Sequence, residues 1–183
     1  MKGYFGIGVE GVSKPMNLGS LLRTAHAFGA SFAFTIAAAF QPRAVGHADT
    51  SDAAANLPLH LYPDVASLAL PAGCRLVGIE ILAEAIDLPT FRHPLQAAYV
   101  LGAERGNLSP ALLERCAFVV RVPSRFCLNL AIAGAIVMYD RMVSLGSYAE
   151  RPVRAGGNAA TVPRPAHGEP IWKKKHRRRL LAP

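Results

Sequence analysis

Residues 118–145, FVVRVPSRFCLNLAIAGAIVMYDRMVSL, show the pattern from which the rest of the chain can be interpreted. They begin with an apolar run of strand length at 118–122 and continue into a long apolar helix at 128–145. Upstream, the same criteria predict strands at 3–9, 32–37, 75–81 and 97–101 and helices at 16–29 and 110–115. Because strands alternate with helical segments, the sequence predicts an α/β domain with a largely parallel sheet and helices on both faces.

The predicted helix at 16–29, MNLGSLLRTAHAFG, is amphipathic. Its apolar stripe, at helical spacing, consists of Leu18, Leu21, Leu22, Ala25 and Phe28. Ser20 and Arg23 fall on the opposite face. Gly29 is suited to end the helix in a left-handed turn, and Ser109 is suited to cap the next short helix.

The remaining segments are predicted to be connections. The polar stretch 41–56 is expected to be a loop with a short helix, and 64–70 one or two helical turns. Beyond about residue 147, proline and glycine interrupt any periodicity. We therefore expect a folded domain over 1–147 and a disordered linker with a basic tail over 148–183.

Positive charge is concentrated at the C-terminal end. The formal net charge is +8, yet residues 1–150 contain eleven basic and eleven acidic residues. Residues 151–183 contain nine basic residues and one acidic residue, Glu169, so the whole excess lies there. A neutral body with a basic tail is expected to contact a polyanion through that tail.

Composition argues against several protein classes. The longest apolar run, 32–40, is far shorter than the roughly 20 residues that span a bilayer, and the N-terminal residues lack the features of a signal peptide. Cys74, Cys116 and Cys127 form no CxxC pair and are expected to be reduced thiols in a cytoplasm. The histidines show no metal-binding spacing, so no metal site is predicted.

The glycine pattern Gly6-x-Gly8-x-x-Gly11 matches the dinucleotide-binding fingerprint only as text. Lys14-Pro15 interrupts the helix that should follow, and no acidic residue closes the next strand. We therefore reject a nicotinamide-dependent oxidoreductase and interpret these glycines as flexible turns after a first strand.

Three further motifs occur in series. The first is Asn17-x-Gly19-x-x-x-Arg23, on the first predicted helix. The second is LGAERGNLS at 101–109, a strand that enters a glycine-bracketed turn where backbone can approach a ligand closely. The third is VRVP at 120–123, followed by Cys127-Leu128-Asn129. In this order and spacing they resemble the motifs of the SpoU-type RNA 2′-O-methyltransferases, over roughly residues 3–146.

The resemblance implies a fold, a cofactor and an assembly. Members of that family have an α/β domain whose C-terminal segment threads a loop to form a trefoil knot. They use S-adenosylmethionine to methylate a ribose 2′-hydroxyl of RNA. They work as homodimers, and their two active sites can borrow residues across the interface. In this chain the apolar helix at 128–145 would help to form that interface.

The resemblance also implies the catalytic residues Asn17, Arg23, Glu104 and Asn129. Asn17 and Arg23 would position and activate the 2′-hydroxyl, which is a poor nucleophile until it loses its proton. Arginine is a poor base because its guanidinium stays protonated. Either a phosphate or the substrate assists, or Arg23 orients the hydroxyl and stabilises the developing alkoxide. Glu104 would pin its loop or contact the RNA.

A pocket for the methyl donor is implied at Ile79, Gly102, Val122, Cys127 and Leu128. The third motif departs from the family pattern, because cysteine replaces the usual serine at Cys127 and the preceding loop is shorter than is typical. A contact made by the serine hydroxyl would be weakened, whereas backbone contacts from Val122 would survive. No histidine is tied to Cys127 in sequence, so no nucleophilic role is predicted for it.

The basic run KKKHRRR at 173–179 is expected to contact the RNA backbone, with Trp172 stacking on a base. Besides Arg23, the predicted RNA-binding residues are Lys173, Lys174, Lys175, Arg177, Arg178 and Arg179. A merely solubilising end is the alternative interpretation.

The leading hypothesis is a cytoplasmic, S-adenosylmethionine-dependent RNA ribose 2′-O-methyltransferase that acts on transfer RNA in preference to ribosomal RNA. The alternative is an RNA-binding protein on the same scaffold that has lost catalysis. Only Cys127 and the short loop support that alternative. Affinity for the methyl donor distinguishes the two, because a binding protein can do without it.

Overall fold

A seven-stranded sheet is the centre of the structure, a computed structural model that describes residues 3–40, 56–104, 106–146, 148 and 155–156. The chain separates into two compact units, 1–146 and 147–183, and all the elements below belong to the first. Most of the predicted loop at 41–56 and the basic run at 173–179 lie outside the described residues. Among the described residues, no helix is both long and apolar enough to cross a membrane.

Every neighbouring pair of strands in the sheet is parallel, in the order β3-β2-β1-β6-β4-β7-β5. The strands are β1 (Tyr4–Glu10), β2 (Phe32–Ile36), β3 (Leu59–Tyr62), β4 (Arg75–Ile79), β5 (Ile86–Asp87), β6 (Gln96–Leu101) and β7 (Phe118–Arg121). The prediction of a largely parallel α/β sheet is confirmed. The trefoil knot implied by the resemblance stays a prediction.

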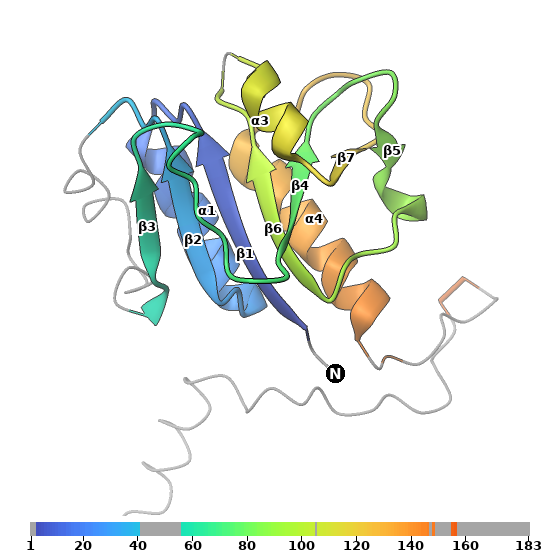
Figure 1. Ribbon diagram of the computed structural model, residues 1–183. Helices are drawn as coiled ribbons and strands as arrows, with labels where there is room; N and C mark the ends of the chain where they lie inside the picture. Colours follow the sequence, from blue (N-terminus) through green and yellow to red (C-terminus); the bar gives the residue numbers. More distant parts are fainter. Residues whose placement is uncertain (1–2, 41–55, 105, 147, 149–154, 157–183) are drawn as a thin grey trace, which may run out of the picture. The chain divides into compact units, whose positions relative to one another are not determined.

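Helices α1 (Pro15–Phe28) and α4 (Leu130–Leu145) lie on one face of the sheet and pack against each other (Figure 1). The short helix α3 (Pro110–Arg115) packs on the opposite face, and a 3₁₀ turn, η2 (Leu88–Thr90), precedes β6. The caps follow the sequence: Gly29 ends α1 at φ +75°, and Ser109 Oγ accepts a hydrogen bond from the Leu112 amide. Asn129 likewise caps α4.

The core forms two layers because successive strand residues face opposite sides of the sheet. Ile7 and Val9 of β1 pack with Leu21 and Leu22 of α1 on one side. The other layer, under α3, consists of Phe32, Phe34, Ile36, Leu68, Leu76, Ala98, Val100, Leu108 and Leu112. The apolar stripe predicted for α1 is therefore the stripe that faces the sheet.

Gly6 and Gly8 lie inside β1, so interpreting them as flexible turns after the first strand is wrong. An added Cβ at Gly8 would come within 2.5 Å of the Phe34 ring, and one at Gly6 within 2.3 Å of the Phe32 ring. These glycines make room for aromatic rings from β2 that lie across the strand. Of the three glycines in the pattern Gly6-x-Gly8-x-x-Gly11, only Gly11 has a turn conformation, at φ +66°.

Two further differences concern short segments. The prediction of helical turns at 64–70 is wrong, because the segment forms one turn, closed by the Leu68 amide donating to the Val65 carbonyl at 3.2 Å, and does not continue as a helix. Strands β3 and β5 were not predicted. They have four and two residues, which is too few for a periodic pattern to show.

A buried polar cluster ties α4 to the residues before β6. His93 Nδ1 lies 2.6 Å from Tyr99 Oη, and Nε2 lies 2.9 Å from the Asp140 carboxylate. Arg141 donates to the Pro94 carbonyl at 2.6 Å and to Tyr99 Oη at 3.1 Å. Burial lowers the pKa of His93, although Asp140 opposes the shift, and burial raises the pKa of Tyr99 to about 12. The C-terminal half of α4 is thereby anchored to the sheet.

The substitution Gly8→Ala tests the packing of the aromatic rings on β1. It is expected to lower the free energy of unfolding by about 1–3 kcal/mol, because the buried Phe34 ring must move to admit the methyl group. Urea unfolding measures the change. Gly106→Ala is the matched control, since nothing lies within 4 Å of an added Cβ there. Equal losses in the two variants would contradict this account of β1.

Candidate active site

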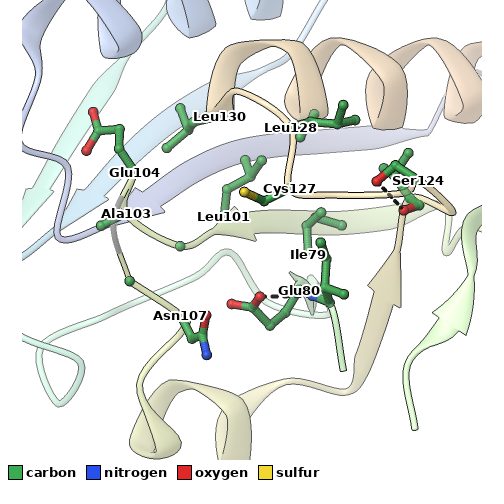
Figure 2. A pocket seen from close by; sticks show the side chains of 15 residues that line it. Ile79, Glu80, Leu101, Ala103, Glu104, Asn107, Ser124, Cys127, Leu128 and Leu130 are labelled. Carbon is green, nitrogen blue, oxygen red and sulfur yellow. Dashed lines mark hydrogen bonds between the residues drawn. The ribbon is translucent and has the colours of Figure 1, made fainter. Parts of the chain in front are cut away.

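A cavity of about 300 Å³ lies where β4, β6 and β7 end (Figure 2). In parallel α/β sheets, ligands bind beyond the carboxyl ends of the strands. The cavity is lined by Ile79, Glu80, Ile81, Leu101, Gly102, Ala103, Glu104, Gly106, Asn107, Val122, Ser124, Cys127, Leu128, Leu130 and Ala133. Its walls are mostly aliphatic, with polar groups concentrated on the loops.

All five residues predicted to bind the methyl donor line this cavity. Ile79 ends β4, Gly102 follows β6 and Val122 follows β7, while Cys127 and Leu128 immediately precede the cap of α4. The fold therefore brings the second and third motifs, which are separate in sequence, to one place. Their donor-binding role stays a prediction.

Gly102 lies where the chain turns back on itself. An added Cβ would come within 3.0 Å of the Gly106 carbonyl oxygen and 3.2 Å of the Leu108 amide nitrogen. These are backbone atoms, which cannot rotate away as a flexible side chain can. The turn after β6 therefore requires a glycine, and it exposes backbone groups to the cavity.

Glu104 connects this turn to the start of α1. Its Oε1 accepts hydrogen bonds from Asn17 Nδ2 at 2.9 Å and from the Lys14 amide at 3.1 Å. Its Oε2 accepts from Ser13 Oγ at 2.9 Å and from the Ser13 amide at 3.2 Å. Partial burial would raise the pKa of Glu104, but the bonds from Asn17 and Ser13 outweigh it and lower the pKa to about 2. The carboxylate is therefore ionised at neutral pH.

Asn129 extends this connection to the start of α4. Its Nδ2 donates to Asn17 Oδ1 at 3.2 Å, and its Oδ1 accepts from the Ala131 amide at 2.9 Å. Three of the four predicted catalytic residues, Glu104, Asn17 and Asn129, thus form one hydrogen-bonded chain. Because both ends of the Asn17 carboxamide are bonded, its orientation is fixed.

Arg23, the fourth predicted catalytic residue, lies elsewhere on α1. Six residues separate it from Asn17, which corresponds to about 9 Å along a helix and about 240° of rotation around it. Arg23 is exposed and is not among the residues that line the cavity. Arg23 therefore does not lie on the side of α1 that carries Asn17, and the structure does not place it at the cavity of its own chain.

Two carboxylates at the site were not predicted from the sequence. Glu80, directly after β4, lines the cavity and accepts a hydrogen bond from the Leu108 amide at 2.8 Å. Glu10, at the end of β1, accepts from the Ser109 amide at 2.7 Å and from Ser109 Oγ at 2.5 Å. The sequence did contain a signal for both residues, because each is an acidic residue at the end of an otherwise apolar strand.

The described lining residues suit a cationic ligand with an apolar part. They include the carboxylates of Glu80 and Glu104 and no lysine, arginine or histidine. A cofactor with a pyrophosphate would meet repulsion from these carboxylates. Among the described residues, no group of three or more potential metal ligands occurs.

Comparison with known proteins points to one family. The SpoU rRNA Methylase family matches residues 5–139. A 23S rRNA (guanosine-2'-O-)-methyltransferase of Nitrosomonas europaea is 32% identical over 146 residues, which cover 72% of this chain and 53% of that protein. The tRNA (guanosine(18)-2'-O)-methyltransferase TARBP1 of Mus musculus is 31% identical over 140 residues, covering 70% of this chain and 9% of that protein. The chain spans about half the length of the first relative and a small part of the second.

Solved structures with the same fold include an rRNA methyltransferase from Sinorhizobium meliloti. It has a TM-score of 0.71 and 25% identity, over 80% of this chain and 58% of that chain. The AdoMet-bound form of that enzyme has a TM-score of 0.69 and 25% identity, over 80% of this chain and 59% of that chain. The likeness therefore extends over nearly all of the unit formed by residues 1–146.

The substitution Glu104→Gln tests the connection between the turn and α1. At neutral pH it is expected to cost about 1–3 kcal/mol of unfolding free energy, because an amide cannot accept all four bonds. The folded-state pKa is depressed, so the contribution of Glu104 is present above its ordinary value of 4.5 and is lost as pH falls toward 2.

The difference between Glu104→Gln and the parent should therefore be largest near pH 7 and shrink below pH 4.5, as measured by urea unfolding. Glu114→Gln, at an exposed carboxylate on α3, is the control and should show little change at either pH. A difference that stays constant from pH 7 to pH 3 would contradict the role given to the carboxylate.

Proposed function

Because the chain belongs to the SpoU rRNA Methylase family, we propose that it transfers a methyl group from S-adenosylmethionine to a ribose 2′-hydroxyl of RNA. One observation carries the proposal. The residues implied for the donor line a single cavity, and from its wall runs the hydrogen-bonded chain Glu104–Asn17–Asn129. The relatives named above methylate the 2′-oxygen of guanosine in rRNA or tRNA, which supports the same reaction class for this chain.

The residues that line the cavity fit S-adenosylmethionine in charge and in polarity. The donor carries a positive sulfonium and an ammonium group, which suit a wall containing Glu80 and Glu104. The aliphatic side chains of Ile79, Leu101 and Leu130 suit its adenine ring. When bound, the donor supplies an electrophilic methyl group.

The protein's part in the reaction is to position the acceptor. The fixed Asn17 carboxamide and Asn129 would hold the RNA ribose near the cavity, and Arg23 would orient the 2′-hydroxyl and stabilise charge on its oxygen as the proton leaves. Glu104 keeps Asn17 in place and is ionised at neutral pH. It thus acts as a positioning residue rather than as the base.

We assign Arg23 to the active site of a second copy in a homodimer. On α1, Met16 lies seven residues before Arg23, on the same side of the helix, and is 75% exposed, and α4, packed beside α1, exposes Ile132 at 54% and Tyr139 at 50%. Exposed apolar side chains on neighbouring helices are typical of an association surface. Pairing two such faces would cover these side chains and would move each Arg23 toward the partner's cavity.

For the substrate we favour transfer RNA over ribosomal RNA, although the relatives include enzymes for both. The basic run at 173–179 would add contacts to the RNA backbone. The three free cysteines suit a cytoplasmic location. A catalytically inactive RNA-binding protein remains the second candidate, on the strength of Cys127 and the short loop before it.

Transfer of labelled methyl from S-adenosylmethionine to unmodified total RNA, followed by digestion to nucleosides, tests the function. Label is expected in a 2′-O-methyl nucleoside. The substitution Arg23→Ala should lower transfer by about 100-fold or more while donor affinity stays unchanged. Arg92→Ala, at an exposed arginine on the loop before β6, is the control. Full turnover by Arg23→Ala would refute the assignment.

Mixing two inactive variants tests whether Arg23 acts across a dimer. Gly102→Ala is expected to distort the loop that walls the donor cavity and so to impair donor binding, because its Cβ would meet the Gly106 carbonyl. In a mixed dimer, the intact cavity of the Arg23→Ala chain would receive Arg23 from the Gly102→Ala chain. Co-refolded mixtures should therefore regain part of the activity. No recovery, with mixed dimers shown to form, would place Arg23 in the site of its own chain.

A further inference from the structure

Phe126 is the most exposed large apolar side chain of the described residues. It is 76% exposed, on the loop that joins β7 to α4. A phenylalanine side chain gains about 1.5–3 kcal/mol when it is buried, so a ligand that covered this ring would gain affinity from it. Within the described residues, therefore, most of the Phe126 side chain remains in contact with solvent.

The loop presents this ring from a defined backbone. Ser124 Oγ donates to the Phe126 carbonyl oxygen at 2.9 Å and lies 3.3 Å from the Val122 carbonyl oxygen. These contacts close a tight turn around Arg125, which is also exposed. Such a turn restricts the backbone conformation at Phe126, so less conformational entropy is lost when the ring contacts a ligand.

Phe126 lies at the edge of the donor cavity. Ser124 and Cys127, on either side of it in the chain, both line that cavity (Figure 2). A ribose whose 2′-oxygen reaches the cavity must bring its own base, or the next base of the strand, close to this edge. Single-stranded RNA bases commonly stack on aromatic side chains, and Arg125 adds a positive charge for the phosphates.

We propose that Phe126 is a stacking platform for a base of the substrate RNA, at or next to the nucleotide that is methylated. This inference rests on the proposed methyltransferase function and adds to it a substrate-positioning residue. It also gives the short third-motif loop a role: the loop carries an aromatic ring and a cation on the side from which RNA must approach.

Two other partners could cover an exposed phenylalanine. A second copy of the chain is one of them, because the proposed homodimer brings a partner to this cavity and both phenylalanine and arginine are frequent in protein interfaces. The donor itself could lie under the ring. The experiment separates these possibilities from the stacking role.

The first measurement is the apparent KM for unmodified total RNA in the methyl-transfer assay. Phe126→Ala should raise it about 5- to 100-fold. Phe126→Tyr and Phe126→Trp should retain most of the affinity, whereas Phe126→Leu, which is apolar but not aromatic, should behave like the alanine variant. Leu95→Ala is the control, since Leu95 is 52% exposed on the loop before β6, at the other end of the sheet.

A second measurement detects stacking directly. The sequence contains one tryptophan, Trp172, so Phe126→Trp combined with Trp172→Phe places a single indole at the cavity edge. Its fluorescence should be quenched when a single-stranded RNA oligonucleotide is added, because indole stacks on bases. Absence of quenching on an oligonucleotide that is shown to bind would overturn the proposal.

Each remaining outcome also decides the question. An unchanged KM in Phe126→Ala, or leucine performing as well as phenylalanine, would overturn base stacking. A loss of S-adenosylmethionine affinity would make Phe126 a cover for the donor, and a change in oligomeric mass would make it a dimer contact. In these cases wild-type transfer to RNA persists. Failure of the wild type itself to transfer methyl would instead overturn the proposed function.

Discussion

The hydrogen bonds of the Glu104 carboxylate are the contacts on which the site depends. They join the turn after β6 to the start of α1, two segments that lie about 90 residues apart in the sequence. Through Asn17 and Asn129 they also reach the first turn of α4. One ionised side chain thus sets the relative positions of all three motifs. This partly buried carboxylate stays ionised far below its ordinary pKa because several donors converge on it.

The same device recurs at the other end of this loop. Glu10 and Glu80, which end β1 and β4, accept hydrogen bonds from consecutive backbone amides at Ser109 and Leu108. Carboxylates at the ends of parallel strands therefore hold the glycine-bracketed turn from two sides and leave its backbone facing the cavity. The rigid sheet fixes the position of the loop, and the loop carries the groups that can contact a ligand.

The main features of the fold could be predicted from the sequence because each strand and helix with a strong periodic pattern was long enough to show it. The cavity residues Gly102 and Val122 followed from the family motifs, whereas Ile79 followed from its position at the end of a predicted strand. Local patterns could not show that Gly6 and Gly8 make room for rings on β2, or that Glu10 and Glu80 brace a distant loop. Those roles depend on tertiary neighbours, and β3 and β5 depend on pairing partners in the same way.

The order of the strands has a consequence for how the chain folds. β1 lies inside the sheet, between β2 and β6, and Tyr4 pairs with Gln96, so an early strand waits for a much later one. Such non-local pairing slows folding, since a long loop must close before its contacts stabilise anything. During synthesis, the apolar strand β1 is exposed on one edge until its partner β6 is made. This interval is when the nascent chain is most prone to aggregate and most dependent on chaperones.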